Sequence, residues 1–226
     1  MAAVHVLGGL SASRDGVPLD GPWLHQRPGD LLALLVAERE RALAAEEIAE
    51  TLWPDRGIAA LGTVHHFVSV LRDRLEPGRA RGDAGAAIET LGRAYRLGES
   101  VVVDADRFIS HAVAGLHAWR EQNAERALRE LLRADALYRG PFLGERDGPW
   151  IVLLERERLR ALAADAWRAL IQLAQRRGDA AAAARHRARL AAQEPWDDDV
   201  QHPPQRDQTR PSDVSQPANG EQIDAS

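Results

Sequence analysis

The chain contains no cysteine, no lysine and few aromatic residues. Without cysteine, it can form neither a disulfide framework nor a thiolate metal site. The longest uninterrupted apolar stretch runs only from residue 31 to residue 37, which is far too short to cross a bilayer. Because no charged and apolar leader opens the sequence, we expect a cytoplasmic protein that does not contact a membrane.

Alanine and arginine dominate what is present, and all 29 basic residues are arginine. A length of 226 residues suffices for two domains that each bury their own core. The pattern of elements changes near residue 100, and after Val200 the sequence is rich in Pro, Gln, Asp and Ser. We therefore predict domains over residues 1–98 and 104–200, followed by a disordered tail over residues 201–226.

The first of these domains carries the pattern of two short helices, a turn and a hairpin. A first helix over 45–53 ends at Pro54. The segment 61–75 has apolar residues at three- and four-residue spacing, which predicts a helix with one buried stripe. Two short strands then flank Gly92 within residues 88–97. This layout is that of a winged helix-turn-helix DNA-binding domain.

The residues before this segment predict strands over 4–10 and 16–19 and a helix that opens at Pro28. Residues 1–98 are thus expected to form an α+β domain of strands, three helices and a hairpin. The tryptophans at 53, 150 and 167 are spaced along the sequence like the buried apolar residues of a helix, so they are expected in the core. Tyr95 is expected to pack against the helices.

The second domain is predicted to be wholly helical. We expect Asp104 or Asp106 to cap a helix that reaches about residue 119, and Asn123 to cap the next helix. A long helix over 149–177 and a last one over 180–193 follow, separated by a Gly-Asp turn. Antiparallel helix pairs of this kind predict a tetratricopeptide-like array. Only two pairs precede residue 200, fewer than the usual three repeats, so an apolar face is left for a partner.

Seven segments in this order and spacing carry a resemblance to a known family. They are LLALL at 31–35, EEIAETLWPD at 46–55, VSVLRDRLEPG at 68–78, IETLGRAYRL at 88–97, VDADRF at 103–108, ALYRGPFL at 136–143, and Trp150 with ERERL at 155–159. Residues 4–200 resemble the actinobacterial antibiotic regulatory proteins, in which an OmpR-type winged helix precedes a bacterial transcriptional activator domain.

The resemblance implies a transcriptional activator that binds direct repeats in double-stranded promoter DNA and regulates antibiotic biosynthesis and other secondary metabolism. The helix at 61–75 would enter the major groove, and the hairpin at 90–95 would touch the minor groove or the backbone. The helical domain would support a homodimer and contact RNA polymerase. No cofactor is implied.

Seven residues are the candidate DNA contacts: Thr63, His65, His66, Ser69, Arg72, Arg74 and Arg93. The first four would read the groove, and the three arginines would hold the phosphate backbone. The alternative interpretation is that the histidines are exposed helix residues without a task, and that the arginines are ordinary solvated residues. A metal site at the two histidines is disfavoured because adjacent residues do not share a helix face.

Two departures from the family pattern oppose DNA binding. Val70 and Asp73 stand where the family commonly has basic residues. An apolar residue loses a charge-assisted contact, and a carboxylate repels phosphate. Residues 1–98 also hold 11 arginines against 13 acidic residues, a net charge near −2. The alternative function is therefore a protein-interaction module with weakened or lost DNA binding.

The sequence offers no support for an enzyme. It contains no Walker-type phosphate loop, no Gly-x-Gly-x-x-Gly after a strand and no Gly-x-Ser-x-Gly elbow. The runs of alternating Glu and Arg at 38–41 and 155–158 are interpreted as helix faces with ion pairs rather than as catalytic acid-base pairs.

Overall fold

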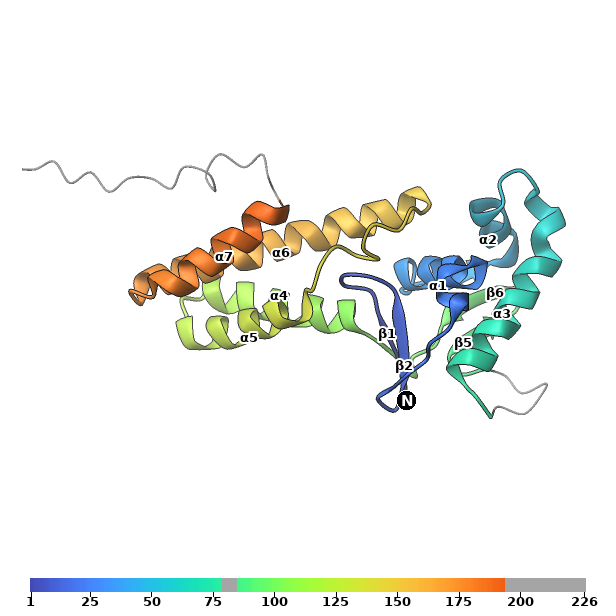
Figure 1. Ribbon diagram of the computed structural model, residues 1–226, viewed down its shortest axis with the longest axis horizontal. Coiled ribbons are helices and arrows are strands. Elements are labelled where there is room, and N and C mark those ends of the chain that lie inside the picture. The colour runs from blue at the N-terminus through green and yellow to red at the C-terminus, as the bar shows by residue number, and fades with distance from the viewer. Residues whose placement is uncertain (79–84, 194–226) are drawn as a thin grey trace, which may run out of the picture.

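The computed structural model describes residues 1–78 and 85–193, so the tail predicted at 201–226 lies outside the described residues. An α+β half occupies one end of an elongated molecule and a helical half the other (Figure 1). The class predicted from the sequence, an α+β unit followed by an all-helical unit, is confirmed.

A four-stranded sheet lies where the two halves meet. In the order β3-β2-β1-β7, its strands are Val17–Pro18, Ser11–Arg14, Ala2–His5 and Val101–Val103. The antiparallel β2–β3 turn places Asp15 and Gly16 at positive φ, and glycine adopts this conformation readily. The strand β7 pairs in parallel with β1 and was not predicted, and β1 begins two residues before the predicted strand.

The remaining elements of the first half form the predicted helices and hairpin. The helices are α1 (Arg27–Ala37), α2 (Ala45–Leu52) and α3 (Leu61–Leu75), with short 3-10 turns η1 (Pro22–His25) and η2 (Gly57–Ala60). The second sheet, of order β4-β6-β5, contains Leu43–Ala44, Ala94–Leu97 and Ile88–Leu91. The helix α3 has the predicted bounds, and Gly92 turns the hairpin with φ 63°.

The second half contains four helices in two antiparallel pairs. They are α4 (Asp104–Arg120), α5 (Ala124–Leu137), α6 (Trp150–Arg176) and α7 (Ala180–Gln193). Gly115 allows α4 and α5 to approach closely, because a Cβ there would lie 2.6 Å from Leu131. The Asn123 side chain accepts a hydrogen bond from the Arg126 backbone at 3.1 Å, which confirms the predicted cap.

The predicted capping role of Asp104 and Asp106 is wrong. Val103 is the N-cap residue of α4, and no side chain caps this end. The Asp104 carboxylate is buried and turns back toward the sheet, where it accepts the backbone N–H of Val6 at 2.8 Å. Because β7 continues directly into α4, Asp104 is already helical, and its side chain reaches the residues that follow β1 rather than the open turn.

The run of Glu and Arg at 38–41 does not form a helix face either, because α1 ends at Ala37. Arg39 instead joins the two halves. Its guanidinium lies 2.5 Å from Asp106 of α4 and 3.0 Å from Glu155 of α6, and its side chain is only 7% exposed. A buried cation held by two carboxylates fixes the angle between the elements that carry them.

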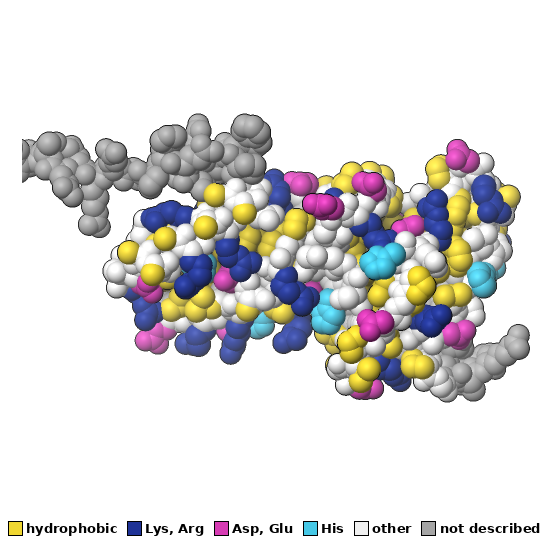
Figure 2. All heavy atoms as spheres, viewed as in Figure 1, with side chains coloured by type: hydrophobic (Ala, Val, Ile, Leu, Met, Phe, Trp, Pro, Cys, Tyr) yellow, Lys and Arg dark blue, Asp and Glu magenta, His cyan; other side chains and the backbone are white. Residues whose placement is uncertain are grey.

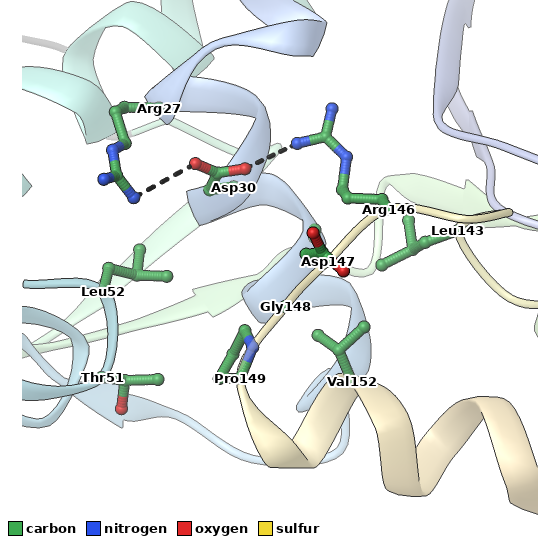
Figure 3. Close-up of a pocket in the computed structure, with 11 residues that line it drawn as sticks. Arg27, Asp30, Thr51, Leu52, Leu143, Arg146, Asp147, Gly148, Pro149 and Val152 are labelled. Atoms are coloured by element: carbon green, nitrogen blue, oxygen red, sulfur yellow. Dashed lines mark hydrogen bonds and ion pairs between the residues drawn. The ribbon is translucent and has the colours of Figure 1, made fainter.

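A second set of charges spans the junction beside a cleft of about 390 Å³ (Figure 3). Asp30 of α1 lies between Arg27, at 3.5 Å, and Arg146, at 2.6 Å. Arg146 also donates a hydrogen bond to the Leu24 carbonyl. The segment that leads into α6 is thereby attached to the first half.

The tryptophans divide into buried and exposed positions. Trp53 and Trp167 are buried as predicted, whereas Trp150 is 71% exposed and the prediction for it is wrong. Trp150 opens α6, so the first turn presents it to solvent rather than to α7. The Trp167 indole donates a hydrogen bond to Asp135 at 2.6 Å.

Replacing Arg39 with alanine should lower the free energy of unfolding by about 2–3 kcal/mol, because buried carboxylate contacts are lost. Urea unfolding monitored by circular dichroism measures this change. Arg41→Ala is the matched control, since its side chain is half exposed and its pairs with Glu38 and Glu47 are worth at most about 1 kcal/mol. Equal losses in both variants would contradict the role given to Arg39.

Stability should fall between about pH 7 and pH 5 because of His186, which is buried in α7. Burial lowers the pKa of His186 below its ordinary 6.5, although Asp135 and Asp179 partly offset this. A depressed histidine pKa means that the unfolded chain binds more protons, so the stabilisation present above pH 6.5 is lost on acidification. His186→Gln should flatten this slope in thermal melts. An unchanged slope would contradict the assignment.

Candidate nucleic-acid interface

The helix α3 presents one face to the core and the opposite face to solvent. Val64, Val68, Leu71 and Leu75 are buried, and they pack against α1 and α2. The opposite face exposes Gly62, His66, Ser69 and Asp73, which recur at three- and four-residue spacing. An outward helix surface at one end of the molecule results (Figure 1).

The four predicted base-reading residues do not share a single direction. His66 and Ser69 lie near the centre of the exposed face. His65 is also exposed but leans toward the hairpin, where its ring meets the edge of Tyr95 with a centroid distance of 6.2 Å. Thr63 is half-buried. A ligand on this helix would therefore meet His66 and Ser69 first.

Aromatic residues of α2 and α3 support this face from behind. The Phe67 ring lies 5.8 Å from Trp53 at the end of α2 and 5.5 Å from His66. Such ring contacts restrict side-chain rotation, so the position of His66 is held by packing.

Arg72 bridges α3 and the hairpin. Its Nε and Nη2 donate to the Ile88 carbonyl at 2.9 and 2.6 Å, and Nη2 also donates to Thr90 Oγ1 at 2.7 Å. The guanidinium carbon lies 6.0 Å from the centre of the Tyr95 ring. These contacts align the hairpin against the helix, a role that sequence reasoning did not assign to Arg72.

The other two predicted arginines are more accessible. Arg74 is exposed, and within the described residues it has no ion-pair partner. The Arg93 side chain is 86% exposed at the hairpin tip, with its Nη2 3.3 Å from Glu46 of α2. These two cations lie on separate elements, Arg74 on α3 and Arg93 at the hairpin tip.

Acidic side chains border the same surface. Asp73 is exposed beside Arg74, and Glu89 pairs with Arg96 across the hairpin at 2.6 Å. This hydrogen bond raises the pKa of the Arg96 guanidinium. The surface thus mixes both signs of charge. Over the described part of the chain, no cluster of three or more metal-binding side chains is found, and no helix is long and apolar enough to span a membrane.

Arg72→Ala should destabilise the domain by about 1–3 kcal/mol, because the Ile88 carbonyl loses a charged donor in a part-buried setting. Thermal unfolding measures the loss, and Arg72→Lys should recover only part of it because lysine cannot form the paired contact. Arg74→Ala serves as the exposed control. Wild-type stability in the Arg72 variant would contradict the bridging role.

Comparisons with known proteins find one matching family and several similar regulators. Residues 103–202 match the family described as the bacterial transcriptional activator domain. The transcriptional regulatory protein EmbR of Mycobacterium tuberculosis is 33% identical over 144 residues, which are 62% of this chain and 36% of EmbR. The transcriptional regulatory protein MoaR1 of the same species is 30% identical over 142 residues, 62% of this chain and 45% of MoaR1.

The structure of M. tuberculosis EmbR in complex with a low-affinity phosphopeptide superimposes with a TM-score of 0.70 at 23% identity. The superposition covers 88% of this chain and 52% of the EmbR chain, and it confirms the predicted fold class. The chain spans between a third and a half of the length of the two curated relatives. The family resemblance derived from the sequence is confirmed.

Proposed function

We propose that this protein is a sequence-specific DNA-binding regulator of transcription, and an activator, because residues 103–202 match the family described as the bacterial transcriptional activator domain. The observation that carries the proposal is the outward face of α3, supported from behind by Phe67 and flanked by a hairpin. The similarity to EmbR and MoaR1, both transcriptional regulatory proteins, supports it.

In this proposal α3 enters the major groove, which admits one α-helix. Fifteen residues give α3 a length of about 22 Å, enough to cross the groove. His66 and Ser69 contact base edges, with Thr63 and His65 at the sides. Arg74 and Arg93 contact phosphates on either side, and Arg72 acts mainly by holding the hairpin in place.

The charge of the surface predicts a modest affinity for any single site. Asp73 lies on the exposed face, and Val70 takes a position where a basic residue would add a contact. Two copies on a direct repeat would raise the overall affinity, because the second binding event becomes intramolecular. We therefore propose a homodimer on promoter repeats, with genes of secondary metabolism as the targets.

In this proposal the two halves of the chain have different roles. Residues 1–98 bind promoter DNA in the cytoplasm, and residues 104–200 recruit RNA polymerase. No cofactor and no catalytic activity are part of it. The second candidate, a protein-interaction module that has lost DNA binding, is favoured by the carboxylate of Asp73 on the face that would meet the groove.

Arg74→Ala should weaken binding to DNA duplexes of any sequence alike, because a phosphate contact is not sequence-specific. The slope of log affinity against log salt should decrease in magnitude by about 1. Asp73→Asn is the opposite variant and should strengthen binding, since it removes a charge that repels phosphate. Fluorescence anisotropy between 50 and 200 mM salt measures both effects.

Arg187→Ala on α7, far from α3, is the control for a general loss of positive charge. If Arg74→Ala and Asp73→Asn both bind DNA as the wild type does, α3 is not the DNA-binding element. If the wild type binds no duplex at 50 mM salt, the interaction-module alternative takes its place.

A further inference from the structure

A row of arginines follows α5 on the side away from the core. Arg126, Arg129 and Arg133 are all exposed, and their three- and four-residue spacing places them on one helix face. From first to last they span about 10.5 Å along the axis. Figure 2 shows several basic side chains, all of them arginine, along this lower edge of the helical half.

The row continues past the end of α5. Arg107 of α4 and Arg139, two residues after α5, line one hollow of about 160 Å³ together with Ala136. Ala136 lies one turn beyond Arg133. Five arginines therefore lie between the start of α5 and the first sheet, although Asp104 also lines the hollow at the sheet end. We call Arg107, Arg126, Arg129, Arg133 and Arg139 the arginine row.

The chain itself neutralises this surface only in part. Arg133 pairs with Glu130 at 2.9 Å, and Arg139 pairs with Asp104 at 3.0 Å. Arg107, Arg126 and Arg129 have no ion-pair partner among the residues that the structure describes. Like charges one helical turn apart repel each other, and Glu130, which attracts both Arg129 and Arg133, offsets part of the repulsion between them.

The position of the arginine row separates it from the candidate DNA interface. The row lies on the helical half, whereas α3 and the hairpin form the opposite end, with the first sheet and α1 between them (Figure 1). One straight duplex bound to the outward face of α3 would not reach α5. Exposed Leu132, which is 41% accessible, lies beside Arg129 and Arg133 and suits a protein surface better than a phosphate backbone.

We propose that the arginine row is a docking surface for an acidic segment of a protein partner, with an apolar side chain placed to meet Leu132. Guanidinium groups bind carboxylates through paired hydrogen bonds, which give such a site directional preference. Complementary charge also speeds encounter and makes binding sensitive to salt. The proposal does not depend on DNA binding by α3.

The test compares two variants of the full chain with the same change in charge. Arg126→Glu with Arg129→Glu reverses the charge of the two arginines of the row nearest the start of α5, and neither residue has an ion pair to lose within the described chain. Arg177→Glu with Arg185→Glu is the matched control, on exposed positions at the far end of α6 and on α7. Circular dichroism melts establish that both variants fold.

The probe is a fluorescein-labelled twelve-residue peptide of Glu-Glu-Leu repeats, with binding followed by anisotropy at 150 mM salt. We expect the wild type and the control to bind alike, and the variant of the row to bind at least tenfold more weakly. Raising the salt to 500 mM should abolish most of the wild-type binding.

Three outcomes would overturn the proposal: no binding by the wild type, equal loss in both variants, or no loss in the variant of the row. The same proteins are also titrated with random-sequence duplex DNA. If the variant of the row loses DNA binding and keeps peptide binding, the row is a DNA contact and the proposal is wrong. Because the peptide assay contains no DNA, a failure of the proposed function leaves its result unchanged.

Discussion

The arrangement of this protein depends on a buried carboxylate at the point where β7 becomes α4. Asp104 accepts hydrogen bonds from the backbone of Val6 and Leu7 and pairs with Arg139. It thereby joins the end of β1, the start of α4 and the segment after α5. A charge so buried is stable only when these partners are all in place, so the helical half leaves the sheet in one direction. Arg39 reinforces the same junction through Asp106 and Glu155.

The fixed junction has a consequence for the proposed regulatory function. The helix α3 lies at one end of the molecule, and α5, which carries three arginines of the row, lies in the helical half at the other end (Figure 1). If α3 binds DNA, the helical half projects away from it at an angle set by Asp104 and Arg39 rather than by a flexible linker. A partner that contacts the helical half is then held at a defined place beside the promoter. This favours recruitment of a partner that binds DNA only weakly by itself.

Features set by neighbouring residues were predictable from the sequence. The stripe of Val64, Val68 and Leu71 places α3 with its observed bounds, and Asn123 caps α5 as expected. A periodic pattern shows that a face is buried but not what covers it. The parallel pairing of β7 with β1 joins residues about a hundred positions apart, and no local signal indicates it. The same reason explains why the sequence predicts a helix cap at Asp104 and a core position for Trp150, and both predictions are wrong.

The candidate site shows the same division. The exposed positions of His66, Ser69 and Arg74 follow from the helix period. The contacts of Arg72 with Ile88 could not be inferred, because they depend on how the hairpin packs on α3. The most direct measurement is the selection of fragmented genomic DNA by the purified protein at about 150 mM salt, followed by sequencing of the retained fragments. The account predicts enrichment of a few promoter fragments that share a direct repeat. Folded protein that enriches no fragment would contradict it.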